Sequence, residues 1–240
     1  MAFMPNLSNK VALVTGGTRG IGRAIAQRLL REGASVAICG RTQNTVDRAV
    51  QDFQSPGKII GHAADVRKIE DVARLFQAVD SAFGRLDILV NNAGEGVFRK
   101  TGEMTPEDWR RNIDLNLNGA FYCSREALAR FTKSGGGFIV NISSLAGKNA
   151  FAGGAGYNAS KAGLNLFTEA MMLDHRHDNV RVSSIMPGSV DTEFGDGSKR
   201  GDASWMIAPE DVAETVAMVV KMPDRTMVSR IEMRPSKPKK

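Results

Sequence analysis

The sequence contains only two cysteines, only two tyrosines and no long apolar run. Cys39 and Cys123 lie far apart and lack metal-ligand spacing, so they argue against a disulfide framework and favour small core residues in a reducing compartment. No stretch approaches the length that a helix needs to cross a bilayer, and the N-terminal segment MAFMPNLSNK lacks the apolar run of a secretion signal. We therefore expect a soluble cytoplasmic protein without a membrane partner.

The charged residues form no dense basic cluster apart from the C-terminal tail. The net charge of +6 makes nucleic acid a candidate partner, but the basic residues are scattered along the sequence except in residues 237–240 (KPKK). Scattered charge is typical of a solvated surface and is also compatible with an anionic ligand or an acidic carrier protein. His62, His175 and His177 have no third ligand at a suitable spacing. We therefore predict neither a nucleic-acid partner nor a bound metal.

Short apolar runs alternate with longer amphipathic ones along the chain. Two helix starts carry a proline in the first turn, Pro106 after the capping residue Thr105 and Pro209, and residues 155–173 also have a helical pattern. Strands that alternate with helices pair in parallel, so the pattern predicts an α/β fold, a doubly wound parallel sheet of the Rossmann type, in a single domain over residues 1–240. The predicted strands span residues 11–14, 35–39, 59–64, 86–90, 138–142, 180–185 and 228–233.

A glycine-rich turn, VTGGTRGIG from Val14 to Gly22, joins the first predicted strand to the first helix. Glycines there let the backbone approach a pyrophosphate closely, and the free N–H groups at the start of the helix attract its charge. The position between strand and helix favours a dinucleotide site over an ordinary tight turn. The candidate residues in this turn are Gly16, Thr18, Arg19, Gly20, Ile21 and Gly22.

An acidic residue is missing where a site that prefers NAD would have one. The second predicted strand ends in CGRT, and Arg41 stands where an Asp or Glu would contact the ribose 2′-hydroxyl. Arg41 can pair with a 2′-phosphate, and Arg19 in the glycine turn can join it. Each arginine taken alone has the plainer interpretation of a solvated side chain. The two together predict NADP(H) as the cofactor.

Tyr157 precedes Lys161 by four residues, so on a helix the two side chains share one face. A tyrosine, with an ordinary pKa of about 10, donates a proton well to the alkoxide that develops when a carbonyl accepts a hydride. A nearby ammonium stabilises the phenolate and lowers that pKa. The pair is commonplace, however, and its spacing alone favours surface packing.

Five motifs in chain order give this pair a context: TGGTRGIG, NNAG, NISS, YNASK and MPGSVDT. Together they resemble the short-chain dehydrogenase/reductase family over residues 10–234, and the resemblance is closest to 3-oxoacyl-carrier-protein reductase-like members. It implies hydride transfer between NADP(H) and a small-molecule carbonyl or alcohol substrate, either free or carrier-linked. It also implies a homodimer or homotetramer built through the helices around Asn112 and Tyr157.

The resemblance assigns roles to single residues. It implies that Tyr157 is the catalytic acid/base, that Lys161 lowers its pKa and holds the nicotinamide ribose, and that Ser144 binds the substrate carbonyl. Asn116 matches the asparagine whose backbone holds a water in the proton relay. The other cofactor contacts that it implies are Asp65 and Val66 on the adenine side, Asn92, Ala93 and Gly94 along the ribose, and Pro187, Gly188 and Thr192 near the nicotinamide.

The end of the chain departs from the family pattern, because VSRIEMRPSKPKK stands where many members have a pair of glycines. The polar segment 189–208 is expected to be a mobile substrate loop. Asp65 has a plainer interpretation as a helix cap, and a non-catalytic nucleotide-binding regulatory protein on the same fold is the alternative to an enzyme. The intact set of Ser144, Tyr157 and Lys161 favours the enzyme.

Overall fold

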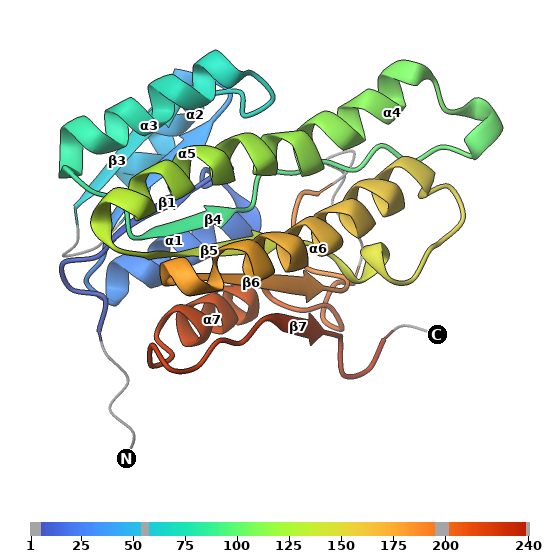
Figure 1. The fold of residues 1–240 in the computed structure, drawn as a ribbon. Helices are drawn as coiled ribbons and strands as arrows, with labels where there is room; N and C mark the ends of the chain where they lie inside the picture. Colours follow the sequence, from blue (N-terminus) through green and yellow to red (C-terminus); the bar gives the residue numbers. More distant parts are fainter. Residues whose placement is uncertain (1–5, 54–57, 195–201, 239–240) are drawn as a thin grey trace.

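A computed structural model describes residues 6–53, 58–194 and 202–238, and a sheet of seven strands forms its centre (Figure 1). The strands are β1 (Val11–Val14), β2 (Ser35–Gly40), β3 (Ile59–Ala63), β4 (Ile88–Asn91), β5 (Gly137–Ile142), β6 (Val180–Pro187) and β7 (Arg230–Met233). Their order is β3-β2-β1-β4-β5-β6-β7, and every neighbouring pair is parallel. The predicted doubly wound Rossmann-type sheet is therefore confirmed.

Helices cover both faces of this sheet. They are α1 (Gly20–Arg31), α2 (Gln43–Asp52), α3 (Ile69–Phe83), α4 (Pro106–Ile113), α5 (Gly119–Ser134), α6 (Ala155–His175) and α7 (Pro209–Val220), with short helical turns η1 (Thr101–Glu103), η2 (Asp114–Asn118), η3 (Leu145–Gly147) and η4 (Arg176–Asp178). The helices α1, α2 and α7 pack on one face, and α3, α5 and α6 pack on the other (Figure 1). Within the described ranges, no helix combines the length and the apolar character that a membrane crossing requires.

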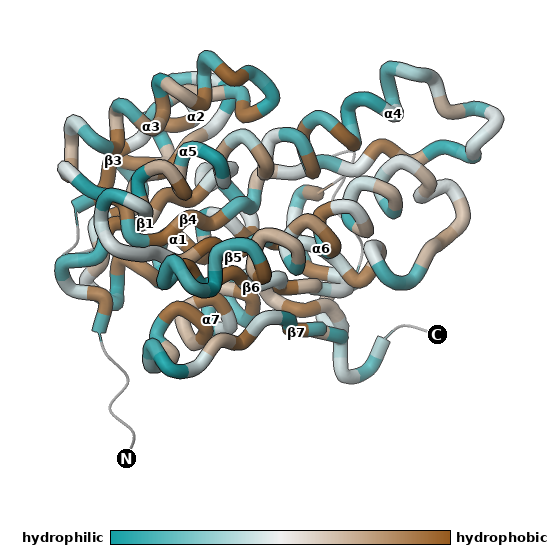
Figure 2. The backbone as a smooth tube through the Cα atoms, viewed as in Figure 1, coloured by the Kyte–Doolittle hydropathy of each residue, from teal (hydrophilic) through white to brown (hydrophobic). Residues whose placement is uncertain are grey.

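The strands are buried on both sides, as their nearly continuous apolar runs require. In β1, Leu13 belongs to the core under α3 and α5, whereas Val14 belongs to the core under α1 and α7, because successive side chains point to opposite faces. Hydrophobic residues are concentrated in the strands of the sheet and on the sides of the helices that face it (Figure 2). The sheet thus forms a packed platform, and the loops after its strands carry the candidate functional residues.

Local sequence signals fix two of the helix starts as predicted. The Thr105 hydroxyl accepts a hydrogen bond from the Asp108 N–H at 3.1 Å, with Pro106 in the first turn of α4. At the start of α7, the Asp211 carboxylate accepts a hydrogen bond from the Ala208 N–H at 3.0 Å. Both bonds satisfy N–H groups that a helix leaves without partners at its beginning.

The predicted element limits differ from the observed ones by one or two residues. β4 begins at Ile88 instead of residue 86, because Asp87 lies before the strand and its carboxylate accepts a hydrogen bond from the Val11 N–H at 2.9 Å. β6 continues to Pro187, because its pairing with β7 persists as far as Met233. The predicted helix 155–173 is also slightly longer, since α6 ends two residues later.

The predicted substrate loop, 189–208, is described only in part, because residues 195–201 lie outside the described residues. Its two ends meet beside β6. Val190 and Ile207 form a parallel bridge, and the Asp191 N–H donates to the Ile207 carbonyl at 2.9 Å. The described ends of this segment are therefore held at the carboxyl edge of the sheet.

Candidate active site

The glycine turn follows β1 where the strand order reverses, between β1 and β4. Gly16 and Gly20 have φ angles of +64° and +53°, which favour glycine, and a Cβ atom on Gly22 would lie 2.3 Å from the Gly16 carbonyl oxygen. Ile21 packs partly buried against the core. Within the described part of the chain, the side chain of Arg19, the N-cap of α1, makes no capping hydrogen bond. The first N–H groups of α1 can therefore bind a diphosphate, so the turn fits the predicted cofactor.

The NNAG segment after β4 supports this turn. The Asn92 side-chain amide donates to the carbonyls of Thr15 and Gly16, at 2.9 and 3.2 Å. The Thr15 hydroxyl accepts hydrogen bonds from the N–H groups of Asn92 and Ala93, both at 3.0 Å. Asn92 and Ala93 therefore lie where the sequence predicts them, and they also hold the turn in shape together with Thr15, which sequence reasoning missed.

Arg19 and Arg41, which the sequence assigns to a 2′-phosphate, follow two adjacent strands. Arg41 comes directly after β2 and is exposed. Arg19 is also exposed, and its guanidinium pairs with Glu193 at 3.1 Å. Thr18 lies close to the end of β2, since a Cβ atom on Gly40 would be 2.8 Å from its methyl group. The turn and the end of β2 thus meet, and Arg19 has a carboxylate partner that the sequence did not indicate.

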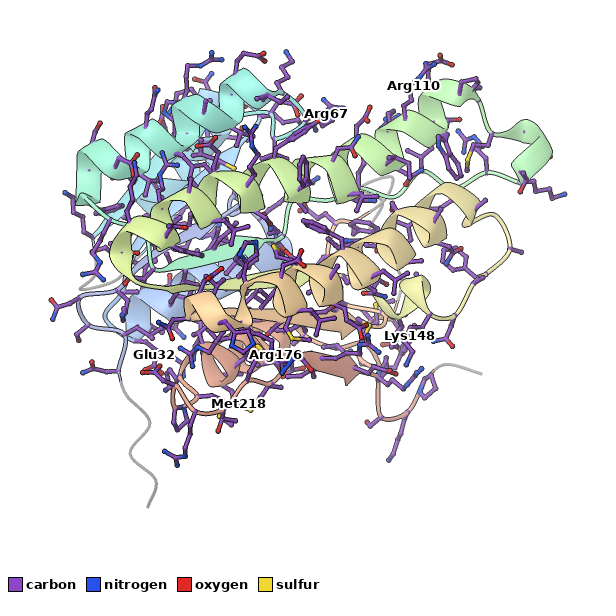
Figure 3. The ribbon with its side chains drawn as sticks, viewed as in Figure 1. Glu32, Arg67, Arg110, Lys148, Arg176 and Met218 are labelled. Atoms are coloured by element: carbon purple, nitrogen blue, oxygen red, sulfur yellow. The ribbon has the colours of Figure 1, made fainter. Side chains whose placement is uncertain are left out.

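Asp65, two residues after the end of β3, is held by Arg67, which Figure 3 labels beside the junction of α4 and α5. Both carboxylate oxygens accept hydrogen bonds from the Arg67 guanidinium, the shortest at 2.6 Å, and one also accepts from the Arg67 N–H at 3.1 Å. These bonds hold the pKa of Asp65 below its usual range. The carboxylate therefore has a local structural role. Val66 is buried against Gly119, where a Cβ atom would lie 2.9 Å from it.

Tyr157, Ser144 and Lys161 come together at the carboxyl ends of β5 and β6 and the start of α6. Tyr157 is only 9% exposed, and its hydroxyl is hydrogen-bonded to that of Ser144. The Ser144 hydroxyl also lies within hydrogen-bonding distance of the Pro187 carbonyl, at 3.4 Å. Lys161 Nζ donates to the Ile142 carbonyl at 2.9 Å and lies 5.9 Å from the centre of the Tyr157 ring. The fold thus brings all three side chains close together at the carboxyl edge of the sheet.

Burial governs the protonation of this group. It raises the pKa of Tyr157, and the hydrogen bond with Ser144 offsets only part of that effect. Burial also lowers the pKa of Lys161 to about 8, because its ammonium is removed from water. In the chain by itself the net pKa of Tyr157 is therefore raised, with burial as the largest cause, and the lowering that the sequence assigns to Lys161 stays a prediction. At neutral pH Tyr157 carries its proton.

Asn116 lies in η2, a π-helical turn between α4 and α5. Its side-chain amide donates to the Glu95 carbonyl at 2.9 Å and to the Ser160 hydroxyl at 3.0 Å. Ser160 in turn donates to the Tyr157 carbonyl at 2.8 Å. Gly94 is adjacent, since a Cβ atom there would lie 3.0 Å from Asn116 Oδ1. Asn116 therefore connects the segment after β4 to the helix that carries Tyr157.

A series of buried polar side chains behind the site was not predicted. Asn91 donates to Asn141 at 2.8 Å and to Ser124 at 3.0 Å, and Asn141 donates to Thr168 at 2.8 Å. These bonds join β4 and β5 to α5 and α6, and so they fix the position of the helix that carries Tyr157 and Lys161. The sequence does hold a signal, because Asn91 ends the apolar run of β4 and Asn141 is the next-to-last residue of β5, and a buried amide requires partners.

The segment after β6 closes the site. The Gly188 N–H donates to the Met233 carbonyl at 2.8 Å, so the C-terminal segment lines this edge although it lacks the glycine pair. Thr192 lies beside the glycine turn, since a Cβ atom on Gly20 would be 3.4 Å from its methyl group. The predicted nicotinamide side and the predicted pyrophosphate side therefore face each other.

The remaining candidates for a metal or redox role are the histidines and the cysteines, of which Cys39 lies beside the glycine turn, with its carbonyl accepting a hydrogen bond from the Gly17 N–H at 3.1 Å. His175 Nδ1 contacts the Asp178 carboxylate at 3.0 Å. Over the residues that the structure describes, no three His, Cys, Asp or Glu side chains gather in a way that could hold a metal ion. Cys39 and Cys123 are buried free thiols, and burial raises the pKa of Cys39 to about 11. The two cysteines are therefore unreactive core residues.

Known proteins share the sequence pattern of this site. The family model of the short chain dehydrogenases matches residues 10–202, a range that contains the glycine turn, Ser144, Tyr157 and Lys161. The chain is also 37% identical over 191 residues to a 3α-hydroxysteroid dehydrogenase of Mediterraneibacter gnavus, and the match covers 78% of this chain and 76% of that relative.

Solved structures share the fold over nearly the whole length. An alcohol dehydrogenase from the archaeon Thermococcus sibiricus, complexed with 5-hydroxy-NADP, is 29% identical with a TM-score of 0.89, covering 96% of this chain and 99% of that one. A metagenomic short-chain oxidoreductase in complex with NADP is 35% identical with a TM-score of 0.85, and the match covers 97% of this chain and 100% of that one. The chain therefore belongs to the short-chain dehydrogenase/reductase family of oxidoreductases.

Proposed function

We propose that this chain is an NADP(H)-dependent oxidoreductase that interconverts a carbonyl compound and its alcohol, with Tyr157 as the proton donor and acceptor. The buried cluster of Ser144, Tyr157 and Lys161 is the observation that supports it most. Buried ionisable groups with shifted pKa values concentrate at functional sites, because burying them costs stability. When bound, NADP(H) supplies the hydride for reduction or takes it up in oxidation.

Each of the three side chains has its own task. The Ser144 hydroxyl, next to that of Tyr157, binds the carbonyl oxygen of the substrate. Tyr157 is protonated at neutral pH, because burial raises its pKa, and it gives its proton to the developing alkoxide. Lys161, with its ammonium 5.9 Å from the centre of the Tyr157 ring, stabilises the phenolate that remains. In oxidation the phenolate takes the proton from the alcohol.

NADP(H) is proposed over NAD(H) because Arg41 follows β2 where an acid would bind the 2′-hydroxyl. Two similar solved structures hold NADP or 5-hydroxy-NADP, which supports the same choice. The glycine turn would hold the pyrophosphate on the N–H groups of α1. The other residues proposed to contact the cofactor are Asp65, Val66, Asn92, Ala93, Gly94, Lys161, Pro187, Gly188 and Thr192, and the backbone of Asn116 is proposed to hold the water of the proton relay.

A 3-oxoacyl-carrier-protein reductase-like activity is one candidate among the carbonyl substrates that this proposal allows. The net charge of +6 supports it, because a basic surface attracts an acidic carrier. The relative from Mediterraneibacter gnavus is named for a 3α-hydroxysteroid. Thioesters, ring ketones and ring alcohols therefore belong in the substrate screen.

We also propose a homodimer or homotetramer in the cytoplasm. Phe121 on α5 and Leu166 and Leu173 on α6 are 46, 70 and 52% exposed, and apolar side chains exposed on neighbouring helices favour association. The two buried free thiols suit a reducing compartment. Light scattering of the purified chain measures the oligomeric state, and a monomer would contradict this part of the proposal.

The test is a screen of ketones, alcohols and 3-oxoacyl thioesters that follows the absorbance of the reduced cofactor. Tyr157→Phe should lower turnover by at least about a hundredfold, because it removes the proton donor, and should leave NADPH binding unchanged. Tyr122→Phe on α5, at the only other tyrosine, is the matched control and should keep full turnover. Turnover retained by Tyr157→Phe would contradict the proton-donor role. NADPH binding without turnover of any substrate by the unaltered chain would favour the non-catalytic alternative.

A further inference from the structure

Three phenylalanines form a cluster at the tyrosine of the proposed site, two of them against its ring and the third against one of these two. The Phe98 ring stands edge-on to the Tyr157 ring, with their centres 5.6 Å apart and 77° between their planes. Phe194 lies against Tyr157 at 5.7 Å and 56°, and Phe151 packs on Phe98 at 5.7 Å. These separations are typical of contacting aromatic pairs. The proton donor is therefore bordered by apolar ring surface.

The three rings come from three separate loops at the carboxyl edge of the sheet. Phe98 follows β4, Phe151 lies between η3 and α6, and Phe194 follows β6. Two glycines make room for them. A Cβ atom on Gly96 would lie 2.5 Å from the Phe98 ring and 3.0 Å from the Phe194 ring, and one on Gly154 would lie 2.7 Å from the Phe151 ring. The backbone is thus shaped to seat these rings beside Tyr157.

Two of the rings stay open to solvent although the tyrosine beside them is buried. Phe98 is 37% exposed and Phe151 is 46% exposed, while Tyr157 is 9% exposed. Rings of this size expose a large apolar area to water unless something covers them. Because this apolar surface adjoins the proton donor, the part of a substrate next to its carbonyl group would lie against it.

We propose that the substrate of this site is a ketone or secondary alcohol that carries an apolar ring, aromatic or alicyclic, next to the reacting carbon, and that Phe98, Phe151 and Phe194 hold this ring. The inference rests on the proposed function, because it names the substrate class of the same site. An apolar ring packs against these side chains as a rigid body, and an aromatic ring adds edge-to-face contacts. A flexible straight chain loses more rotational freedom when it binds.

The test compares two methyl ketones of equal carbon number, acetophenone with its benzene ring and the straight-chain 2-octanone. The unaltered chain should reduce acetophenone with a kcat/KM at least about tenfold higher. Phe98→Leu and Phe194→Leu keep an apolar side chain but remove the ring, and each should lower kcat/KM for acetophenone about three- to tenfold, mainly through KM. Their kcat/KM for 2-octanone should change by less than about twofold.

Binding without turnover gives an independent measure. Acetophenone binding, followed by ligand-observed NMR, should weaken by the same factor in both variants. Gly96→Ala would displace the Phe98 and Phe194 rings. This variant should also lower kcat/KM for acetophenone while leaving kcat/KM for 2-octanone nearly unchanged. Phe83→Leu is the matched control, because Phe83 ends α3 at the opposite edge of the sheet. This variant should leave kcat/KM unchanged for both ketones.

The outcomes separate this inference from the proposed function. Faster turnover of 2-octanone or of a 3-oxoacyl thioester than of acetophenone, or equal losses for both ketones in the variants, would overturn the ring-substrate inference and leave the oxidoreductase proposal standing. Absence of all turnover would contradict the proposed function instead. In that case, failure of acetophenone to bind in the NMR measurement would overturn the ring-substrate inference as well.

Discussion

The proposed cofactor region and the proposed substrate region lie at the same edge of the sheet but are built differently. The turn after β1 is shaped by backbone, with Gly16 and Gly20 at positive φ and Asn92 bonded to main-chain carbonyls. The surroundings of Tyr157 are shaped by large side chains from separate loops, such as Phe98 and Phe194. The first region suits the proposed cofactor, whereas the second can change its ligand through single substitutions.

A cofactor region that is shaped by backbone should lose its NADPH affinity when a side chain is introduced where the backbone needs the space. Gly22→Val would place Cβ 2.3 Å from the Gly16 carbonyl oxygen, and no side-chain movement relieves this contact. NADPH affinity, measured by calorimetry, should fall on the order of a hundredfold or more. Gly102→Ala is the matched control, because nothing lies within 4 Å of a Cβ atom there. Unchanged NADPH affinity in Gly22→Val would place the cofactor elsewhere.

Cofactor preference is the one property of the first region that we assign to a side chain. Arg41→Asp removes a charge-assisted bond to the 2′-phosphate and adds repulsion, so the ratio of NADPH to NADH affinity should fall about ten- to a hundredfold. Arg48→Asp, at an exposed arginine on α2, makes the same charge change farther along the chain and should leave the ratio unchanged. An unaltered ratio in Arg41→Asp would remove the argument for NADP(H).

The smallest expected effect lies where the two regions meet, at Lys161. Its pKa is lowered to about 8 by burial, so the free protein loses this positive charge as the pH rises through that value. NADPH affinity should therefore be constant below about pH 8 and weaken about three- to tenfold above it. In Lys161→Arg, which stays charged throughout, this fall should disappear. A fall that persists in Lys161→Arg would assign the titration to another group.

The sequence predicts the features that depend on neighbouring residues. The glycine turn, the cap at Thr105 and the ends of the strands all have short-range causes, and the structure confirms them within one or two residues. The position of Lys161 beside Tyr157 follows from helix geometry in the same way.

What the sequence could not predict depends on contacts between distant residues. Arg19 pairs with Glu193 far along the chain, which no local pattern indicates. The Phe98 and Phe194 rings meet at Tyr157 only after the loops that follow β4 and β6 are brought together by the sheet. The net direction of the Tyr157 pKa shift also could not be predicted, because spacing shows that an ammonium is near but not how deeply the hydroxyl is buried.

The central claim is that this chain transfers a hydride directly between NADPH and a carbonyl carbon while Tyr157 supplies the proton. It is tested most directly with NADPH that carries deuterium at C4 of the nicotinamide, on one face or the other, and a ketone that the screen has identified. The product alcohol should carry deuterium on its carbinol carbon with only one of the two labelled cofactors, and Tyr157→Phe should form almost no product. An alcohol without deuterium from either cofactor would contradict the account.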